Sequence, residues 1–392
     1  MLKNKNVFLG ITGSIAAYKS VDIARRLIEQ GATVNVVMTA ASCRFIPPYT
    51  LEAVTGNPVH VDLFQDSFSH INLSKESDLL IIAPVTANTI NKLSCGIADD
   101  LLSNLWLTYE GPVIMAPAMN YRMYRNTIVQ KNIKALKKSG IELVGPEEGN
   151  LACGEEGTGR MSEVPEIIEA AVSAMTPKDL LKHKILITAG PTVEPIDPVR
   201  FISNRSSGKM GYALALAAKR RGASVTLISG PTNLNPPAGL NFIKTEKASE
   251  MKTAVFKHLP KVTSIIMAAA VSDFSPSAIA KVKLKKGNLN SLKLKKNSDI
   301  LRELGKRKAK KILIGFAAET GKGIENARTK LKEKNLDMIV LNNVMQKGAG
   351  FDVDTNIVTL INKKGGKREY PLMKKIDVAN IILDNMLELR KR

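Results

Sequence analysis

Cysteine, tryptophan and long apolar runs are all scarce in this 392-residue sequence. Its three cysteines, Cys43, Cys95 and Cys153, are widely spaced and odd in number, which suits reduced thiols better than a disulfide framework or a zinc site. No stretch of apolar residues approaches the length that spans a bilayer. We therefore expect a folded protein of the cytoplasm.

The first residues have the charge order of a secretory signal, with lysines within residues 1–5 and an apolar run at 7–11. That run is broken early by Thr12-Gly13-Ser14. Tyr18-Lys19-Ser20 then continues an amphipathic helix where a signal would supply a small-residue cleavage site. We therefore interpret the segment as part of the folded domain.

Aromatic residues make up only 5% of the chain, whereas the net charge is +21. Residues 1–175 hold 15 Lys+Arg against 18 Asp+Glu, which leaves 42 basic and 18 acidic residues, a net charge of +24, for residues 176–392. Such a field attracts nucleic acid, membrane surfaces or small polyanions such as nucleotides. Charge alone leaves these classes open. A nucleic-acid surface, however, needs basic residues interleaved with aromatics or a recognition helix, and the sequence offers neither.

The length exceeds what one hydrophobic core usually serves, so two domains are expected. In the first half, strands are predicted at 7–11, 33–38, 78–83, 112–115 and 141–144, and helices at 15–29, 87–93 and 127–138. Strands separated by helices of this size specify a parallel, doubly wound sheet that is covered on both faces. The pattern pauses in polar, Pro-containing sequence at 175–179, which predicts domains at 1–176 and 177–392.

The second half repeats this alternation. Strands are predicted at 185–188, 224–228, 264–268, 311–314 and 337–341, and helices at 209–221, 249–258 and 324–333. Between them, strict alternation at 281–288 and 292–295 flanks a Gly-Asn turn and predicts a hairpin with one apolar and one lysine face. The predicted fold class is α/β, with two Rossmann-like doubly wound domains and a lysine-rich β-hairpin inserted in the second.

Three loops of the first half follow predicted strands and are rich in small or amide residues, at 10–17, 83–89 and 115–120. In doubly wound sheets ligands bind beyond the carboxyl ends of the strands. Ser14 can cap the helix that follows it and leave backbone N–H groups free for a phosphate. Taken alone, this first loop is better interpreted as a turn without a ligand, because the full G-x-G-x-x-G pattern is absent. The three loops together indicate a binding site.

The second and third loops resemble the two signature segments of the flavin-containing cysteine decarboxylases. Val85-Thr86 replaces Ala-Ser in the first segment, and Tyr124 stands where the family often has Trp in the second. The resemblance implies a flavoprotein fold that binds FMN. The FMN contacts that it implies are Gly13, Ser14, Ile15, Thr39, Thr86, Asn88 and Ala116.

The same resemblance directs attention to His70 and Cys153, although a lone His or Cys is more often structural than catalytic. The segment 151–161 around Cys153 has too many glycines and charges for a core element, and we interpret it as a mobile flap with an accessible thiol. In this family FMN oxidises the substrate's terminal cysteine thiol, carbon dioxide leaves, and reduced FMN returns a hydride. Cys153 would then donate a proton, Asn120 would hold the substrate carboxylate, and His70 would orient the substrate or accept its thiol proton.

In the second half, residues 206–211 could be mistaken for a P-loop. Ser203 stands where the first Gly is required, and Met210 replaces the magnesium-binding hydroxyl. The longer run 188–211 instead looks nearly complete for bacterial phosphopantothenate-cysteine ligases. Further segments agree with this resemblance in order, at 268–274, 315–320 and 330–337. The resemblance to a decarboxylase fused to a ligase therefore covers essentially the whole chain.

In the ligase family CTP activates the phosphopantothenate carboxylate as an acyl-cytidylate, and the amine of cysteine displaces CMP. The resemblance implies that Asn204 binds the acyl-cytidylate, that Arg200 assists its conversion and that Lys281 reaches the reacting intermediate. Residues expected to surround CTP are Met267, Ala268, Ala269, Asp273, Lys281, Ser298, Asp299, Ile300, Leu301, Phe316, Lys330 and Lys334. Mg²⁺ is expected to be held mainly by the CTP phosphates, because phosphate displacement needs positive charge that lysines and Mg²⁺ share.

The expected substrates are 4'-phosphopantothenate, L-cysteine and CTP, with neither nucleic acid nor a membrane as a partner. The family also implies homo-oligomers, with flavin domains in trimers, ligase halves in dimers and both gathered into a dodecamer. A nearer alternative keeps the flavin domain and changes its substrate, because relatives decarboxylate peptide C-terminal cysteines or prenylate flavin. The attached ligase favours phosphopantothenoylcysteine.

Overall fold

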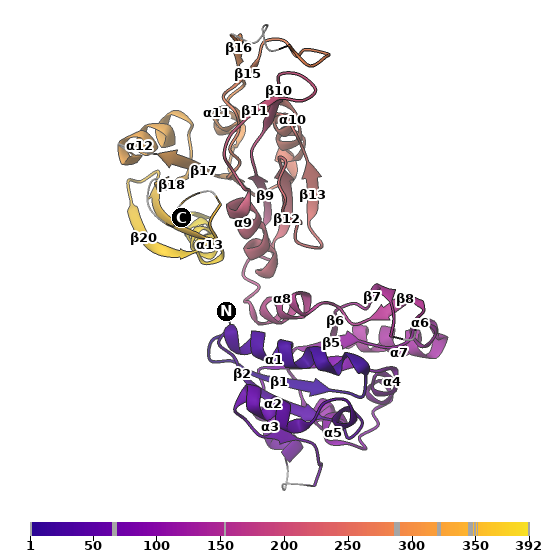
Figure 1. Cartoon of the computed structure of the whole chain (residues 1–392). Coiled ribbons are helices and arrows are strands. Elements are labelled where there is room, and N and C mark those ends of the chain that lie inside the picture. The colour runs from indigo at the N-terminus through magenta and orange to yellow at the C-terminus, as the bar shows by residue number, and fades with distance from the viewer. Residues whose placement is uncertain are drawn as a thin grey trace. The chain divides into compact units, whose positions relative to one another are not determined.

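The computed structural model describes residues 2–64, 69–152, 154–285, 291–319, 323–343, 348, 350 and 352–390. The chain divides into two compact units, Met1–Thr176 and Pro177–Arg392 (Figure 1). We call them unit 1 and unit 2 and describe each by itself. None of the described helices is both long and apolar enough to cross a membrane.

Unit 1 is built on a parallel sheet whose strands follow the order β3-β2-β1-β4-β5-β6. The strands are β1 (Asn6–Ile11), β2 (Thr33–Met38), β3 (Val59–His60), β4 (Leu79–Val85), β5 (Val113–Pro117) and β6 (Glu142–Leu143). Every residue of β4 and β5 is buried, as expected for central strands with both faces covered. The order reverses between β1 and β4, and this switch point is where such sheets bind ligands.

Helices cover both faces of this sheet. They are η1 (Ile15–Tyr18), α1 (Lys19–Glu29), η2 (Ser42–Arg44), α2 (Pro48–Thr55), α3 (Ser69–Glu76), α4 (Ala87–Cys95), α5 (Leu101–Thr108), α6 (Tyr121–Arg125), α7 (Thr127–Lys138) and α8 (Val164–Met175). Successive residues of β1 point to opposite faces, so Val7 and Leu9 pack in a core with α1 and α8, whereas Phe8 packs in a core with α4, α5 and α7. The predicted doubly wound architecture is confirmed for this unit.

The segment around Cys153 lies in an antiparallel hairpin formed by β7 (Glu147–Asn150) and β8 (Glu156–Arg160). Cys153 itself, in the connection between these strands, lies outside the described residues. The carbonyl of Gly159 accepts a hydrogen bond of 3.0 Å from the Met119 amide. A Cβ on Gly159 would lie 2.1 Å from the Met119 carbonyl oxygen, so only glycine permits this approach. The hairpin is thereby packed against the loop that follows β5.

Unit 2 repeats the design with a sheet in the order β13-β12-β9-β14-β17-β18-β19-β20. Its strands are β9 (Lys184–Ala189), β12 (Ser224–Ser229), β13 (Asn241–Lys244), β14 (Ser264–Met267), β17 (Ile312–Glu319), β18 (Met338–Asn343), β19 (Thr355–Asn362) and β20 (Lys367–Lys374). The first six of these are parallel, and β19 and β20 extend the sheet as an antiparallel edge.

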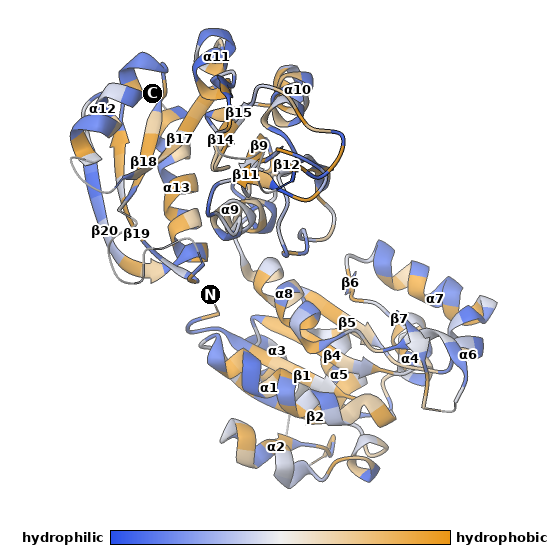
Figure 2. Cartoon of the chain, turned by 45° about the horizontal axis from the view of Figure 1, so that its top comes forward, coloured by the Kyte–Doolittle hydropathy of each residue, from blue (hydrophilic) through white to orange (hydrophobic). Residues whose placement is uncertain are grey.

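Two helical layers enclose the sheet of unit 2. The helices are α9 (Lys209–Arg220), α10 (Ala248–His258), η3 (Leu259–Lys261), α11 (Ile300–Arg307), α12 (Gly323–Glu333) and α13 (Lys375–Arg390). One core contains α9 and α13, and the other contains α10, α11 and α12. Apolar residues gather on the central strands and polar ones on the outer faces of the helices (Figure 2). The sequence patterns did not predict α11, α13 or the antiparallel edge.

The lysine-rich hairpin expected at 281–295 is not confirmed. Residues 281–285 form no strand, and residues 286–290 lie outside the described part of the chain. The strand β16 (Leu294–Lys296) pairs instead with β15 (Phe274–Pro276). The amide and carbonyl of Leu284 bond to Asp197 and Arg200, so the backbone of this segment is engaged by another loop instead of a neighbouring strand.

Candidate active sites

A cavity of about 980 Å³ opens at the carboxyl ends of the strands of unit 1, and its lining residues come from the loops after β1, β2, β4 and β5 and from the β7–β8 hairpin. This volume suits a cofactor-sized ligand. Six of the predicted flavin residues line it, together with Asn120: Gly13, Ser14, Ile15, Thr39, Thr86 and Asn88. Ala116 does not, because it is buried within β5; Ala118, beyond the end of that strand, lines the cavity in its place.

The other two predicted catalytic residues cannot be placed by their side chains. His70 belongs to the first turn of α3, but its side chain lies outside the described part of the structure, as does all of Cys153. Leu151 and Ala152, the two residues before Cys153, line the cavity. The roles of His70 and Cys153 stay predictions.

Hydroxyl groups hold the loops after β1 and β4 together. Thr12 donates a hydrogen bond of 2.9 Å to the Pro84 carbonyl and accepts one of 3.0 Å from the Thr86 amide. Thr86 caps α4 by accepting from the Thr89 amide at 3.3 Å. The positive end of α4 therefore lies in the cavity wall, where it favours an anionic group such as the phosphate of a flavin nucleotide.

Gly13 provides a test of this site. A Cβ at this position would lie 2.7 Å from the Cβ of Ala41 and 3.2 Å from its carbonyl carbon, so the two loops would be forced apart. We expect Gly13→Ala to lower the flavin content of the purified protein, measured by visible absorbance, and to leave ligation unchanged. The double variant Gly13→Ala/Ala41→Gly should regain flavin because the nearest clash is gone. Full flavin occupancy in the single variant would contradict the prediction.

Asn120 is held by both ends of its amide. Its Oδ1 accepts from the Arg122 amide at 2.8 Å and so caps α6, and its Nδ2 donates to Glu155 at 2.9 Å. Arg122 also forms an ion pair of 2.7 Å with Glu155. These contacts fix the orientation of a neutral amide in the cavity wall and connect it to the hairpin that carries Cys153.

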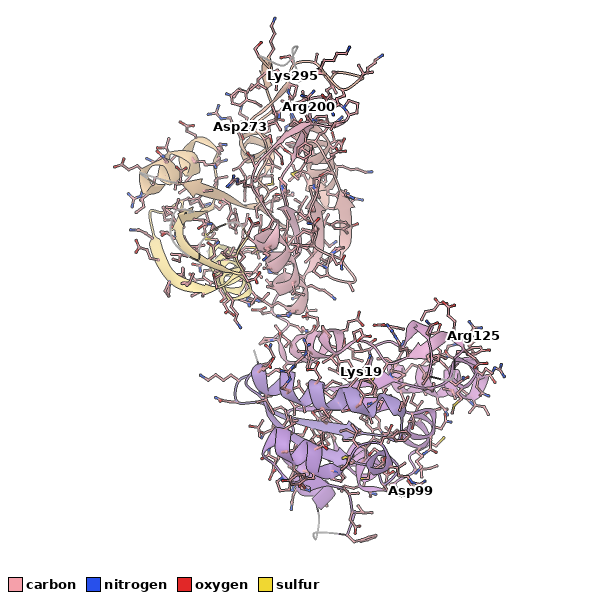
Figure 3. The ribbon with its side chains drawn as sticks, viewed as in Figure 1. Lys19, Asp99, Arg125, Arg200, Asp273 and Lys295 are labelled. Atoms are coloured by element: carbon pink, nitrogen blue, oxygen red, sulfur yellow. The ribbon has the colours of Figure 1, made fainter. Side chains whose placement is uncertain are left out.

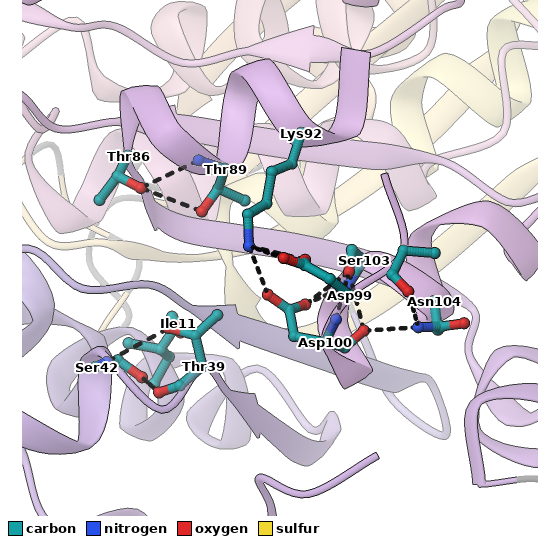
Figure 4. A network of polar contacts seen from close by, with 11 residues as sticks. Ile11, Thr39, Ser42, Thr86, Thr89, Lys92, Asp99, Asp100, Ser103 and Asn104 are labelled. Atoms are coloured by element: carbon teal, nitrogen blue, oxygen red, sulfur yellow. Dashed lines mark hydrogen bonds and ion pairs between the residues drawn. The ribbon is translucent and has the colours of Figure 1, made fainter. Parts of the chain in front are cut away.

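Charged residues that the sequence patterns did not predict also line this cavity. Lys92 contacts Asp99 at 2.7 Å and Asp100 at 3.7 Å (Figure 4), and its hydrogen bond to Asp99 is the main cause of a raised pKa. Lys19 contacts Glu163 at 3.1 Å. The Asp100-x-x-Ser103 capping box in the sequence indicates where α5 begins. The contact of Asp100 with Lys92 beside this cavity is visible only in the fold.

Unit 2 has a cavity of about 460 Å³ at the carboxyl ends of β14 and β17. All but one of the residues predicted to surround CTP line it: Met267, Ala268, Ala269, Asp273, Ser298, Asp299, Ile300, Leu301, Phe316, Lys330 and Lys334. Asn204 lines it as well and donates a hydrogen bond of 3.1 Å to the Ala270 carbonyl. The structure therefore brings together residues that are up to 130 positions apart in the sequence.

Two predicted catalytic residues of unit 2 are not among those that line this cavity in the described structure. Arg200 is paired with Asp197, and Lys281 is exposed. Figure 3 shows Arg200 at the same end of unit 2 as Asp273 and Lys295. Both residues lie on an arm that we define as the β10 (Val193–Pro195) and β11 (Phe201–Ser203) ribbon with the attached residues 280–285.

Lysines dominate the electrostatics of this cavity. The Lys334 amine contacts Asp299 at 2.8 Å, and the Lys330 amine donates a hydrogen bond of 3.1 Å to the Phe316 carbonyl. Burial, followed by the nearby charge of Lys334, lowers the pKa of Lys330 below its ordinary value. A triphosphate in this cavity would meet two ammonium groups already directed by neighbouring side chains and backbone.

The lowered pKa of Lys330 predicts an unusual pH dependence. Only the protonated amine attracts a triphosphate, and this amine loses its proton at a lower pH than an ordinary lysine does. We therefore expect the KM for CTP to rise as the pH increases through that lowered pKa. Lys330→Arg should flatten the rise, and Lys330→Met should increase the KM about tenfold at neutral pH. Identical pH profiles of KM for wild type and Lys330→Arg would contradict this.

Part of the cavity wall comes from the end of the run 188–211, in which only Arg200 and Asn204 were predicted as site residues. Residues 206–211 line the cavity although they do not fit a P-loop, and Gly208 precedes α9 with a φ of 77° that favours glycine. Lys209 contacts Asp354 at 2.7 Å, and Lys375 is buried with its amine bonded to the Val353 carbonyl. Gly208 and Lys209, at the start of a 12-residue helix, were the available signal for this wall, whereas no motif in the sequence pointed to Lys375.

Comparison with known proteins identifies the family of the chain. Residues 1–176 match the family model described as Flavoprotein, and residues 180–389 match the model described as DNA/pantothenate metabolism flavoprotein C-terminal domain. The "Coenzyme A biosynthesis bifunctional protein CoaBC" of Bacillus subtilis is 46% identical, covering 100% of this chain and 99% of that protein. The chain belongs to the CoaBC family. The predicted resemblance and the α/β fold class are confirmed.

Two solved structures are also similar. The crystallised C-terminal domain of a CoaBC protein has 44% identity and a TM-score of 0.48, covering 55% of this chain and 100% of that one. A PPC decarboxylase mutant complexed with pantothenoylaminoethenethiol has 30% identity and a TM-score of 0.39, covering 43% of this chain and 97% of that one. As a member of the CoaBC family, the chain is a bifunctional enzyme of coenzyme A biosynthesis and a flavoprotein.

Proposed function

We propose that the two activities of this enzyme are divided between its two cavities. Unit 2 uses CTP to join cysteine to 4'-phosphopantothenate, and unit 1 decarboxylates the resulting phosphopantothenoylcysteine to 4'-phosphopantetheine with FMN. One observation carries the assignment: six of the seven residues expected for the flavin and eleven of the twelve expected for CTP line separate cavities, one within each unit.

In unit 1, bound FMN supplies the oxidation and re-reduction of the substrate's thiol-bearing carbon. The chain's own residues hold and protonate the substrate. Asn120 binds the carboxylate through a neutral amide, which fixes the group without opposing the loss of its charge. Cys153 donates a proton to the decarboxylated product, and His70 orients the substrate thiol or accepts its proton. Glu155 and Arg122 keep the Asn120 amide in place.

In unit 2, Lys330 and Lys334 hold the triphosphate together with Mg²⁺, and the Asp299 segment and Phe316 complete the nucleotide site. Asn204 binds the acyl-cytidylate. Arg200 and Lys281 serve the second step, in which the amine of cysteine displaces CMP, by stabilising the charge that develops at the reacting carbonyl and the departing phosphate.

The position of the arm supports a ligase that works as a pair of chains. Arg200 and Lys281 do not line the cavity of their own chain among the described residues. The arm, the adjoining β15–β16 ribbon and the connection between them also expose apolar side chains: Val199 (58%), Phe201 (58%), Phe274 (50%), Ile279 (53%), Val282 (73%) and Leu294 (49%). Such a surface suits a second copy of the chain, whose cavity the arm would enter. Flavin-unit trimers and a dodecamer stay predictions.

An assay of the purified protein tests the whole proposal. Phosphopantothenate, cysteine, CTP and Mg²⁺ should yield phosphopantetheine, detected by mass spectrometry, with one pyrophosphate released per product. Omission of CTP should abolish pyrophosphate release and product. If CTP is consumed and phosphopantothenoylcysteine accumulates without decarboxylation, the flavin unit acts on another cysteine-ended substrate, and that half of the proposal is wrong.

A further inference from the structure

A buried carboxylate lies at the tip of the β10–β11 ribbon. The side chain of Asp197 is fully buried, and its Oδ1 accepts hydrogen bonds of 2.8 Å from the amides of Val199 and Arg200. Its Oδ2 accepts from the Arg200 guanidinium, with Nε at 3.0 Å and the nearer terminal nitrogen at 2.5 Å. The hydrogen bond from Arg200 is the main cause of a pKa well below the ordinary value, so the carboxylate is ionised throughout the working pH range.

Asp197 also reaches a second segment that is far away in the sequence. Its Oδ2 accepts from the Leu284 amide at 3.2 Å, and Arg200 donates to the Leu284 carbonyl at 2.8 Å. The Ala280 amide donates to the Ile196 carbonyl at 3.0 Å. The segment 280–285, which we call the lysine segment, is therefore held by its backbone at Ala280 and at Leu284, on either side of Lys281. One carboxylate thus connects the guanidinium of Arg200 with the backbone that carries Lys281.

We infer that Asp197 is the positioning residue of the ligase unit, which sets Arg200 and the lysine segment at a fixed separation for the displacement of CMP by cysteine. The inference rests on the proposed ligase function. Long cationic side chains lose considerable conformational freedom when they are held in place, and catalysis depends strongly on such placement. A buried, ionised acceptor that binds both segments holds that placement before the substrate arrives.

Removal of the Asp197 carboxylate should slow the amide-forming step and not the activation step. Activation of phosphopantothenate uses the triphosphate site of Lys330 and Lys334, which lie on or just after α12. No hydrogen bond or ion pair recorded among the described residues joins Asp197 to that site. The amide-forming step uses Arg200 and Lys281. Loss of Asp197 should therefore leave the first step and impair the second.

Asp197→Asn tests the role of the carboxylate charge, because it preserves the size of the side chain and the turn at residues 197–200. Its amide oxygen can keep the bonds to the Val199 and Arg200 amides, whereas the new NH₂ group faces donors on Arg200 and Leu284. Asp179→Asn is a matched control, since Asp179 accepts two hydrogen bonds from Arg221, at 2.9 and 2.6 Å, in the same unit. Thermal unfolding and CTP binding would be recorded for both variants.

With cysteine omitted, the single-turnover release of pyrophosphate in Asp197→Asn should stay within about twofold of wild type, whereas kcat for amide formation should fall by about tenfold or more. Asp179→Asn should leave both steps unchanged. Because Asp197 also holds the backbone at Leu284, the double variant Asp197→Asn/Arg200→Ala should lose more activity than Arg200→Ala alone but less than the two single losses combined. Equal losses in both steps, or additive losses in the double variant, would overturn the inference. Absence of CTP-dependent pyrophosphate release in wild type would instead refute the proposed ligase function.

Discussion

Asn120→Asp is expected to stop decarboxylation while ligation continues, so that phosphopantothenoylcysteine accumulates. The substitution keeps the size of the side chain and its cap on α6, but it replaces an NH₂ donor by a carboxylate oxygen. That oxygen would face Glu155, now 2.9 Å from the Asn120 amide nitrogen, and would repel the carboxylate of the substrate. We expect a fall in kcat/KM for decarboxylation of about 10²-fold or more.

A matched control for this prediction lies six residues away. Asn126 caps α7 by accepting from the Ile128 amide at 2.9 Å, but it is not among the residues that line the cavity. Asn126→Asp should therefore decarboxylate normally. Synthetic phosphopantothenoylcysteine, supplied without CTP, separates the two units in this assay, and visible absorbance checks that FMN is retained. Normal decarboxylation by Asn120→Asp with bound FMN would remove Asn120 from its role.

Much of the fold could be predicted because its central strands are continuous apolar runs. In β4, Leu79–Val85, every side chain is buried, and α4, the helix that follows, begins after the capping residue Thr86. The helix α5 escaped prediction because its eight residues are mostly apolar and show no clear period, so its capping residue Asp100 was the better signal. The helix α11 is amphipathic but also has only eight residues, and it begins after the capping residue Asp299.

The segment 280–285 shows that local sequence alternation can predict a wrong strand pairing. Alternation at 281–288 predicts a hairpin, but the amide and carbonyl of Leu284 bond to Asp197 and Arg200, more than 80 positions earlier in the chain. Because no local pattern encodes that partner, the sequence alone could not show that the segment belongs to the arm. Lys209 likewise has its acidic partner, Asp354, 145 positions later in the chain.

The residues expected to surround CTP come together in one cavity for a different reason. They belong to motifs whose members lie just beyond strand ends, such as Ala268 and Ala269 after β14, and parallel strands bring those ends to one edge of the sheet. Ala116 lies inside β5 and does not line the cavity, whereas Ala118, which lines it, has passed the strand end. A motif in the sequence therefore predicts which loop lines the cavity. Which residues of that loop line it depends on where the strand before it ends.

Mixed dimers are expected to recover ligase activity from two inactive chains. Arg200 and Asn204 are four residues apart, yet Asn204 lines the cavity of its own chain and Arg200 does not. If the arm enters the partner's cavity, a chain with Arg200→Ala and a chain with Asn204→Ala together form one intact site, with Asn204 from the first and Arg200 from the second. Random pairing makes half of the dimers mixed, each with one working site of two, so about a quarter of wild-type activity should return.

The control for this experiment uses two variants of the same cavity. Asn204→Ala and Asp273→Ala both alter residues that line the cavity of their own chain, so every mixed dimer carries one defect in each site and activity should not return. The pairs would be co-expressed at equal levels, and the recovered activity would be compared with the expected quarter. If Arg200→Ala with Asn204→Ala stays as inactive as the control pair, the arm serves its own chain, and closure of the ribbon onto its own cavity replaces the paired arrangement.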